Sequence, residues 1–288
     1  MNRAIKWFDY ITINIYWLGL TAISQTMTPL VVPLLVQQFV GEAQKGTYYG
    51  RLRLWQLMTA LLIQALMGML SDNSNNKWGR RRPFIFLGTI GVIIVIILIG
   101  FSTNMSGMPG YWFLFAMIML LMVGANTAHG AQQGLIPDLV PLEQRGRFSG
   151  VKAIFEIPLP IILVGFTIGH MVKAGKIWGG LIVLICILVI TGLITMFVPE
   201  TKNRTKFALN WTPFIRLILM TAIFTSIILL MGAVASKATA FFSDISSMAY
   251  LWILGGIGLL TMVISVFLGV QLCTTVSLGK EKKNTPAF

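Results

Sequence analysis

The chain has 288 residues, of which 56% are hydrophobic and only 11% charged, and its mean hydropathy is +0.81. Soluble domains carry about 25% charged residues, so this composition excludes a soluble globular protein and predicts an all-α polytopic membrane protein. A net charge of +13 would suggest nucleic-acid binding in a soluble protein. Here we expect no nucleic-acid partner, because the cations gather in short segments between apolar runs, where they set membrane topology.

Eight apolar runs are long enough to cross a membrane as helices, since a span needs about 20 predominantly apolar residues. Lys and Arg gather in the segments on the side of the N-terminus, whereas the segments on the other side hold few, among them Lys45, Arg51 and Arg53. This asymmetry predicts that both termini lie in the cytoplasm. The expected runs are roughly 11–40, 52–72, 84–102, 111–133, 151–172, 178–198, 213–235 and 248–272.

Polar residues interrupt several of these runs, which is costly in hydrocarbon unless they face a partner or a cavity. The first run is rich in Asn, Gln, Ser and Thr, and its Pro29 and Pro33 should bend it. These polar groups could hold the first helix to its neighbours or line a cavity. Glu156 could likewise be a functional carboxylate or pair with a nearby cation, Lys152 or Arg147. The candidates for a solute cavity are Asn14, Gln25, Gln56, Asn126 and Glu156.

A short basic stretch, residues 68–84, joins the second and third runs. From its charges alone, the stretch is a topology anchor on the cytoplasmic side. Gly68 lies one turn before Asp72 on the same helix face, so the backbone there can approach a neighbouring helix closely.

The order of residues in this stretch resembles the signature loop between helices two and three of the major facilitator superfamily. The pattern Gly-x-x-x-Asp-x-x-x-x-Lys-x-Gly-Arg-Arg-Arg carries the resemblance. The Pro-Phe-Ile that follows, and Gly88, are most similar to the sugar:cation symporter branch, which includes sucrose and glycoside–pentoside–hexuronide carriers. A second loop, 134–147, resembles the Asp-Leu-Val-Pro-x-x-x-Arg-Gly segment of the same carriers.

This resemblance implies that the two loops pack together as a cytoplasmic gate. Asp138 and Glu143 of the second loop are then expected to pair with the arginines of the first. The gate residues that the resemblance implies are Gly68, Asp72, Gly79, Arg80, Arg81, Arg82, Asp138, Glu143 and Arg145.

The resemblance also implies a domain organisation. Residues 1–200 would form a six-helix half of two inverted three-helix repeats, 201–212 a cytoplasmic linker, and 213–288 a two-helix part of a second half. The stretch 269–283 can be aligned with the basic stretch as a degenerate repeat of it, with Cys273 in the place of the aspartate. We therefore expect the chain to be truncated after the eighth helix. Its gate would be completed by another copy, other membrane subunits or missing sequence.

Two functions fit these features. The first is a secondary carrier for a small organic solute, such as a glycoside, that works by alternating access. The second is a non-transporting subunit or assembly factor of a larger membrane complex, for example a photosynthetic one with bound pigment. The second stays open because the membrane parts of the second and fourth runs lack the acids with which melibiose-type relatives bind cations. No nucleotide loop, metal-ligand cluster or nucleophile motif is present in the sequence, so we expect no enzyme, no metal and no cofactor beyond that pigment.

Overall fold

All regular elements that the structure describes are helices, and they form seven spans that are long and apolar enough to cross a membrane. The prediction of an all-α polytopic membrane protein is therefore confirmed. The structure is a computed structural model, and it describes residues 6–74, 76–198, 200, 211–241 and separate short stretches between 249 and 271.

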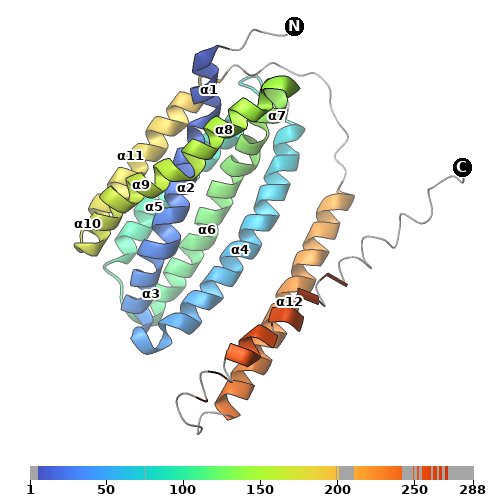
Figure 1. Cartoon of the computed structure of the whole chain (residues 1–288). Helices are drawn as coiled ribbons and strands as arrows, with labels where there is room; N and C mark the ends of the chain where they lie inside the picture. The colour runs from blue at the N-terminus through green and yellow to red at the C-terminus, as the bar shows by residue number, and fades with distance from the viewer. Residues whose placement is uncertain are drawn as a thin grey trace, which may run out of the picture. The chain divides into compact units, whose positions relative to one another are not determined.

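The chain divides into two compact units, Met1–Leu209 and Asn210–Phe288. The first unit contains six of the seven spans (Figure 1). Its elements are α1 (Trp7–Asn14), α2 (Tyr16–Thr26), the π-helix η1 (Met27–Val31), α3 (Val32–Val40), α4 (Glu42–Asp72), α5 (Arg82–Ser102), α6 (Gly107–Gln133), α7 (Leu135–Leu139), the 3₁₀ turn η2 (Leu142–Gln144), α8 (Arg145–Glu156), α9 (Pro158–Leu163), the π-helix η3 (Val164–Ile168), α10 (Gly169–Lys173) and α11 (Ile177–Thr195).

The second unit contributes the seventh span, Phe214–Val234, within α12 (Thr212–Phe241). The eighth predicted run, 248–272, is described only in separate short stretches. Almost all of the predicted linker, 201–212, lies outside the described residues. The same is true of the degenerate repeat of the basic stretch, 269–283.

Helix α4 begins well before the apolar run that predicted it. It is 31 residues long, or roughly 46 Å at 1.5 Å per residue, whereas the hydrocarbon core of a bilayer is about 30 Å thick. Lys and Arg are good helix formers, so the helix continues through the polar residues that hydropathy assigns to a loop. Arg53, expected in an outer segment, therefore lies on a helix that packs against α3 and α6.

The two prolines of the first span are accommodated by a π-helical turn. In η1 the Val32 N–H donates to the carbonyl of Met27, five residues back. The next carbonyl, that of Thr28, would need an N–H from Pro33, which has none. The Tyr49 hydroxyl of α4 donates to that carbonyl instead, at 2.8 Å. A change of helix type thus accommodates the prolines, and the Tyr49 hydrogen bond ties the first span to α4.

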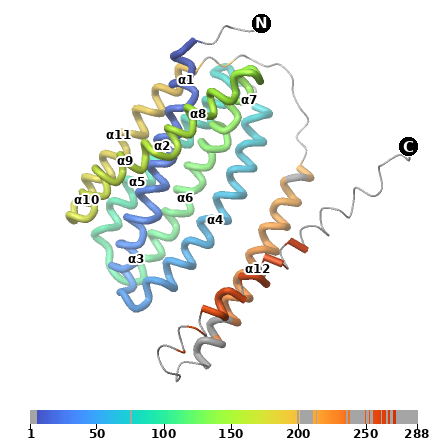
Figure 2. Tube along the Cα trace, in the orientation of Figure 1, coloured from blue at the N-terminus to red at the C-terminus, as the bar shows by residue number. Residues whose placement is uncertain are grey.

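Helix α6 packs against both α4 and α5 (Figure 2), and glycines make both contacts close. A Cβ on Gly130 would lie 2.8 Å from the Gln64 carbonyl oxygen and 2.9 Å from the Gly68 nitrogen. A Cβ on Gly88 of α5 would lie 2.6 Å from the Gly124 carbonyl oxygen. Small residues allow helix backbones to approach in a membrane, and the backbone at Gly68 does approach a neighbour as its position predicted.

We expect Gly88→Ala to destabilise the first unit, because its methyl group would meet α6 backbone that cannot rotate away. Overpacking of this kind costs about 1–3 kcal/mol. Gly91→Ala is the matched control on the same helix, since the nearest atom to its added Cβ is the Gly124 Cα at 4.0 Å. Thermal unfolding of the purified protein in mild detergent measures both, and equal melting temperatures for the two variants would contradict the close α5–α6 contact.

Candidate functional site

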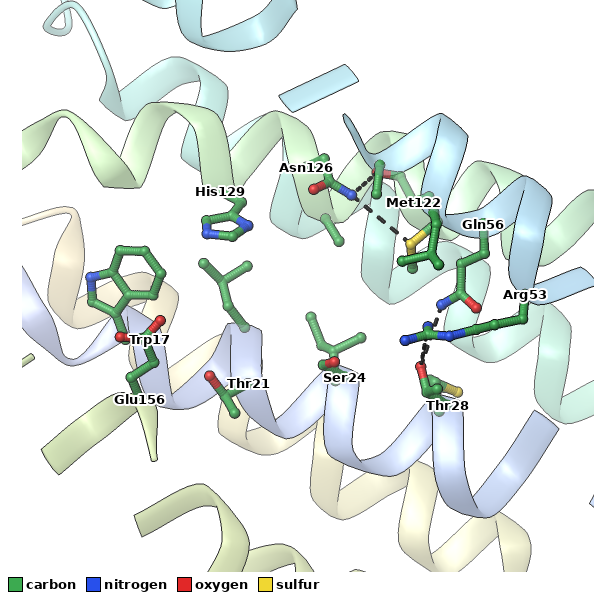
Figure 3. Close-up of a pocket in the computed structure, with 16 residues that line it drawn as sticks. Trp17, Thr21, Ser24, Thr28, Arg53, Gln56, Met122, Asn126, His129 and Glu156 are labelled. Atoms are coloured by element: carbon green, nitrogen blue, oxygen red, sulfur yellow. Dashed lines mark hydrogen bonds between the residues drawn. The ribbon is translucent and has the colours of Figure 1, made fainter. Parts of the chain in front are cut away.

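A cavity of about 360 Å³ opens among α2, η1, α4, α6 and α8 (Figure 3). Apolar side chains form most of its wall, and polar side chains reach it from each of these elements. The polar and charged residues of the wall are Thr21, Ser24, Thr28, Arg53, Gln56, Asn126, His129 and Glu156.

One end of the cavity is organised around Thr28. Its hydroxyl oxygen accepts hydrogen bonds from Arg53 Nη1 and Gln56 Nε2 of α4, both at 3.4 Å. Across the cavity, Asn126 Nδ2 donates to the Met122 carbonyl of its own helix at 2.9 Å, which leaves the amide oxygen as an acceptor for a solute. This end therefore offers donors and acceptors from three helices.

The other end contains Trp17 and a pair of opposite charges. The Lys152 ammonium lies 3.8 Å from the centre of the Trp17 ring, and the His129 ring meets the same tryptophan edge-on at 5.1 Å. Lys152 also pairs with Glu156, one turn away on α8, at 3.5 Å. The Glu156 carboxylate thus borders the cavity and is paired with Lys152. A partly exposed pair such as this one contributes about 0–1 kcal/mol to stability.

Three of the five predicted cavity residues, Gln56, Asn126 and Glu156, line this cavity. The structure places Asn14 elsewhere: it is fully buried in α1 and donates to the Tyr10 carbonyl at 2.9 Å. Gln25 also lies outside this wall. It follows Ser24 in α2, and successive residues of an α-helix point about 100° apart.

Sequence reasoning missed several wall residues that helical spacing could have found. Those on the first span recur every three or four residues, which is one face of a helix. That face carries Trp17, Thr21, Ser24 and Thr28.

A second polar site, the loop ion cluster, consists of Asp72, Arg80, Arg81, Asp138 and Glu200. The Arg81 side chain is only 7% exposed. Its Nη2 bonds Asp72 at 2.6 Å, and its Nε donates to Asp138, which also pairs with Arg80. The Arg81 backbone N–H donates to the Glu200 carboxylate at 3.0 and 3.2 Å. The ends of α4, α7 and the segment after α11 are thus joined through one residue.

Two glycines make room for this cluster. Gly134 lies directly against the Arg81 guanidinium, so that a Cβ there would overlap it. Gly79 has a φ of +119°, in the region that favours glycine, and a Cβ there would collide with the Glu200 carboxylate. The glycine in the Gly-Arg-Arg-Arg pattern is therefore required by its backbone conformation and by the acid beside it.

The remaining predicted gate residues have different surroundings. Arg145 donates to the carbonyls of Val140 and Pro137 at 3.0 and 2.7 Å, so it braces its own loop. Glu143 is exposed, and neither it nor Arg82 belongs to an ion pair within the described part of the chain. Glu200 was missed because it follows the sixth run in a polar break that carries no pairing signal of its own.

The six packed spans of the first unit define an integral, multi-pass membrane protein, and they enclose a cavity with several polar side chains in its wall. Residues 46–277 match the protein family described as MFS/sugar transport protein. The chain belongs to this family, and the resemblance to the major facilitator superfamily is confirmed.

Individual relatives share part of the chain. It is 27% identical over 191 residues to a sucrose transport protein of Arabidopsis thaliana, and the matched region covers 51% of this chain and 30% of the relative. It is 28% identical over 220 residues to a class H tetracycline resistance protein of Pasteurella multocida, and the matched region covers 74% of this chain and 48% of the relative. The chain thus spans less than half the length of these two relatives.

We expect Gly134→Ala to weaken the loop ion cluster, because the added methyl group occupies the place of the Arg81 guanidinium. Displacing a buried charge from its carboxylates costs about 3–5 kcal/mol when no partner remains. The loss of stability should be smaller than this if Arg81 still reaches Asp72. Gly146→Ala, in the first turn of α8, is the control because nothing lies within 4 Å of its added Cβ. Thermal unfolding should show a lower melting temperature for the first variant alone, and an unchanged one would refute the close fit at Gly134.

Proposed function

We propose that this chain is part of a secondary carrier that takes a small, oxygen-rich organic solute, such as a glycoside, into the cavity of the first unit. The observation that carries the proposal is the set of hydrogen-bonding side chains which converge there from separate helices. Solute sites are mostly apolar, with a few placed polar groups that fix the orientation of the ligand. The amides of Gln56 and Asn126, the hydroxyls of Thr21 and Ser24, and Arg53 suit hydroxyl and ether oxygens.

The cavity wall includes one carboxylate, Glu156, and one guanidinium, Arg53. Glu156 is paired with Lys152, so the carboxylate does not need a cationic solute to offset it. The family and the sucrose transport relative support a glycoside. Tetracycline, named for the other relative, is the alternative to test.

We further propose that the loop ion cluster is a cytoplasmic gate. Arg81 holds the ends of α4, α7 and the segment after α11 together, so residues 1–200 would move as one body during alternating access. In this proposal the basic loop and both termini face the cytoplasm. The second half of the carrier would include residues 213–288 beyond the 201–212 linker. Further helices would come from additional sequence, another copy or another membrane subunit.

The cavity is tested by comparing Gln56→Met with Gln25→Met. Both substitutions replace an amide by an apolar side chain of similar length, but only Gln56 faces the cavity. Loss of one hydrogen bond to a buried partner costs about 1–2 kcal/mol, so uptake of the transported glycoside at low concentration should fall about tenfold in Gln56→Met. Uptake into proteoliposomes should be measured for a panel of glycosides, including sucrose, and for tetracycline. Transport of no panel member by the complete wild-type carrier that contains this chain, or equal loss in both variants, would refute the proposal.

The gate is tested by Asp72→Asn. The Asp72 side chain is 53% exposed, and Arg81 keeps Asp138 when Asp72 is neutralised, so the stability of the fold should change by about 1 kcal/mol or less. If Asp72 controls a gate, uptake should nevertheless fall more than about tenfold. Glu143→Gln, an exposed carboxylate without an ion pair in the described structure, should retain wild-type uptake. Normal flux in Asp72→Asn, with normal insertion, would show that the cluster is structural only.

A further inference from the structure

An apolar groove of about 140 Å³ runs between α5 and α11 on the side of the first unit away from the solute cavity's wall. Its sides come from matching stripes on the two helices, three or four residues apart, which face one another across the groove. Phe86, Ile90 and Ile93 form one side, and Val189, Leu193 and Met196 form the other.

The floor of this groove presents no hydroxyl that lacks a partner. Thr89 lies there, and its hydroxyl bonds both the Tyr16 hydroxyl and the Ile85 carbonyl. Gly192 lies opposite, where a Cβ added to it would be in ordinary van der Waals contact with Thr89 Cγ2, at 3.5 Å. A polar solute would find nothing to bind in such a groove, whereas a hydrocarbon chain would lose only its contact with other lipids.

The end of the groove nearest the basic loop carries aromatic and cationic groups. Trp78 meets the Phe86 ring edge-on, with ring centres 5.2 Å apart, and is about half exposed. Tryptophan is enriched where a membrane meets water. Arg82 lies one turn before Phe86 on the same face of α5. Its side chain is partly buried, and its Nε has no hydrogen-bond partner among the described residues.

Arg82 differs from the other two arginines of its triplet. Arg80 and Arg81 both pair with Asp138, and no acid of the described chain pairs with Arg82. A guanidinium binds phosphate oxygens with two parallel hydrogen bonds. Basic sites at the polar end of transmembrane helices are the usual place for anionic lipid head groups.

We propose that this groove is a binding site for one anionic phospholipid, with an acyl chain between α5 and α11 and the phosphate on Arg82. Trp78 then marks the depth of the head group. The site is separate from the solute cavity, which lies among α2, η1, α4, α6 and α8, so the proposal stands whether or not the chain transports a glycoside.

The test is native mass spectrometry of the full chain, purified in mild detergent and mixed with dioleoylphosphatidylglycerol or dioleoylphosphatidylcholine. One cation near an anionic lipid gives about a fivefold preference, so the wild-type chain should retain one phosphatidylglycerol about five times more than one phosphatidylcholine. Arg82→Gln should abolish the preference, and Arg82→Lys should restore most of it. Since Lys keeps the charge without the fork of the guanidinium, it also shows that loss in Arg82→Gln does not come from unfolding.

A second pair of variants tests the groove itself. Ile90→Trp fills the groove and should reduce retention of both lipids, whereas Ile97→Trp, two turns further along α5 and outside the groove, should retain lipid as the wild type does. Equal retention of the two lipids by the wild type, or full retention by Ile90→Trp, would overturn the proposal. So would a dimer that forms without lipid and is broken by Ile90→Trp, because a second copy would then be the occupant of the groove.

Discussion

The first unit depends on the burial of one charged side chain, Arg81. Taking a guanidinium out of water costs several kcal/mol unless carboxylates and other acceptors surround it. Here those acceptors come from segments far apart in the sequence: Asp72 ends α4, Asp138 lies on α7, and Glu200 follows α11. Satisfying Arg81 therefore fixes where three spans end. The glycines at 79 and 134 follow from the same constraint, because a side chain at either position would occupy the space of the cluster.

The middle of the unit is fixed by close helix contacts rather than by charge. Hydrophobic burial gives little preference among helices in lipid, so packing at small residues decides which backbones meet. Glycine pairs set the α4–α6 and α5–α6 contacts. The π-helical turn in the first span adds a polar tie, since the Thr28 carbonyl that Pro33 leaves unpaired is taken by Tyr49. The Thr28 side chain on the same turn then reaches Arg53 and Gln56, so the chemistry of the cavity depends on how the prolines are accommodated.

Polar and apolar groups are thus separated on two sides of one helical unit. Hydrogen-bonding groups of α2, η1, α4 and α6 converge on the cavity, while α5 and α11 present hydrocarbon to the membrane, with the Thr89 hydroxyl satisfied internally. The family to which the chain belongs gives this separation a purpose, since a carrier must be polar inside and apolar outside. It also makes the transporter reading better supported than a subunit or assembly factor without transport.

The sequence alone determined the membrane class and the seven described spans, and its resemblance to the facilitator superfamily predicted that Asp138 pairs with the basic loop. Hydropathy and the order of charged residues are local properties, so they can be read from the sequence without knowledge of how the helices pack. Only the tertiary structure decided which polar residues share a cavity, because helix rotation separates Ser24 from Gln25 and buries Asn14 in a different place. The contact of Glu200 with Arg81 joins residues 119 positions apart. Such a contact depends on how α11 packs beside α5, which no spacing within either segment encodes.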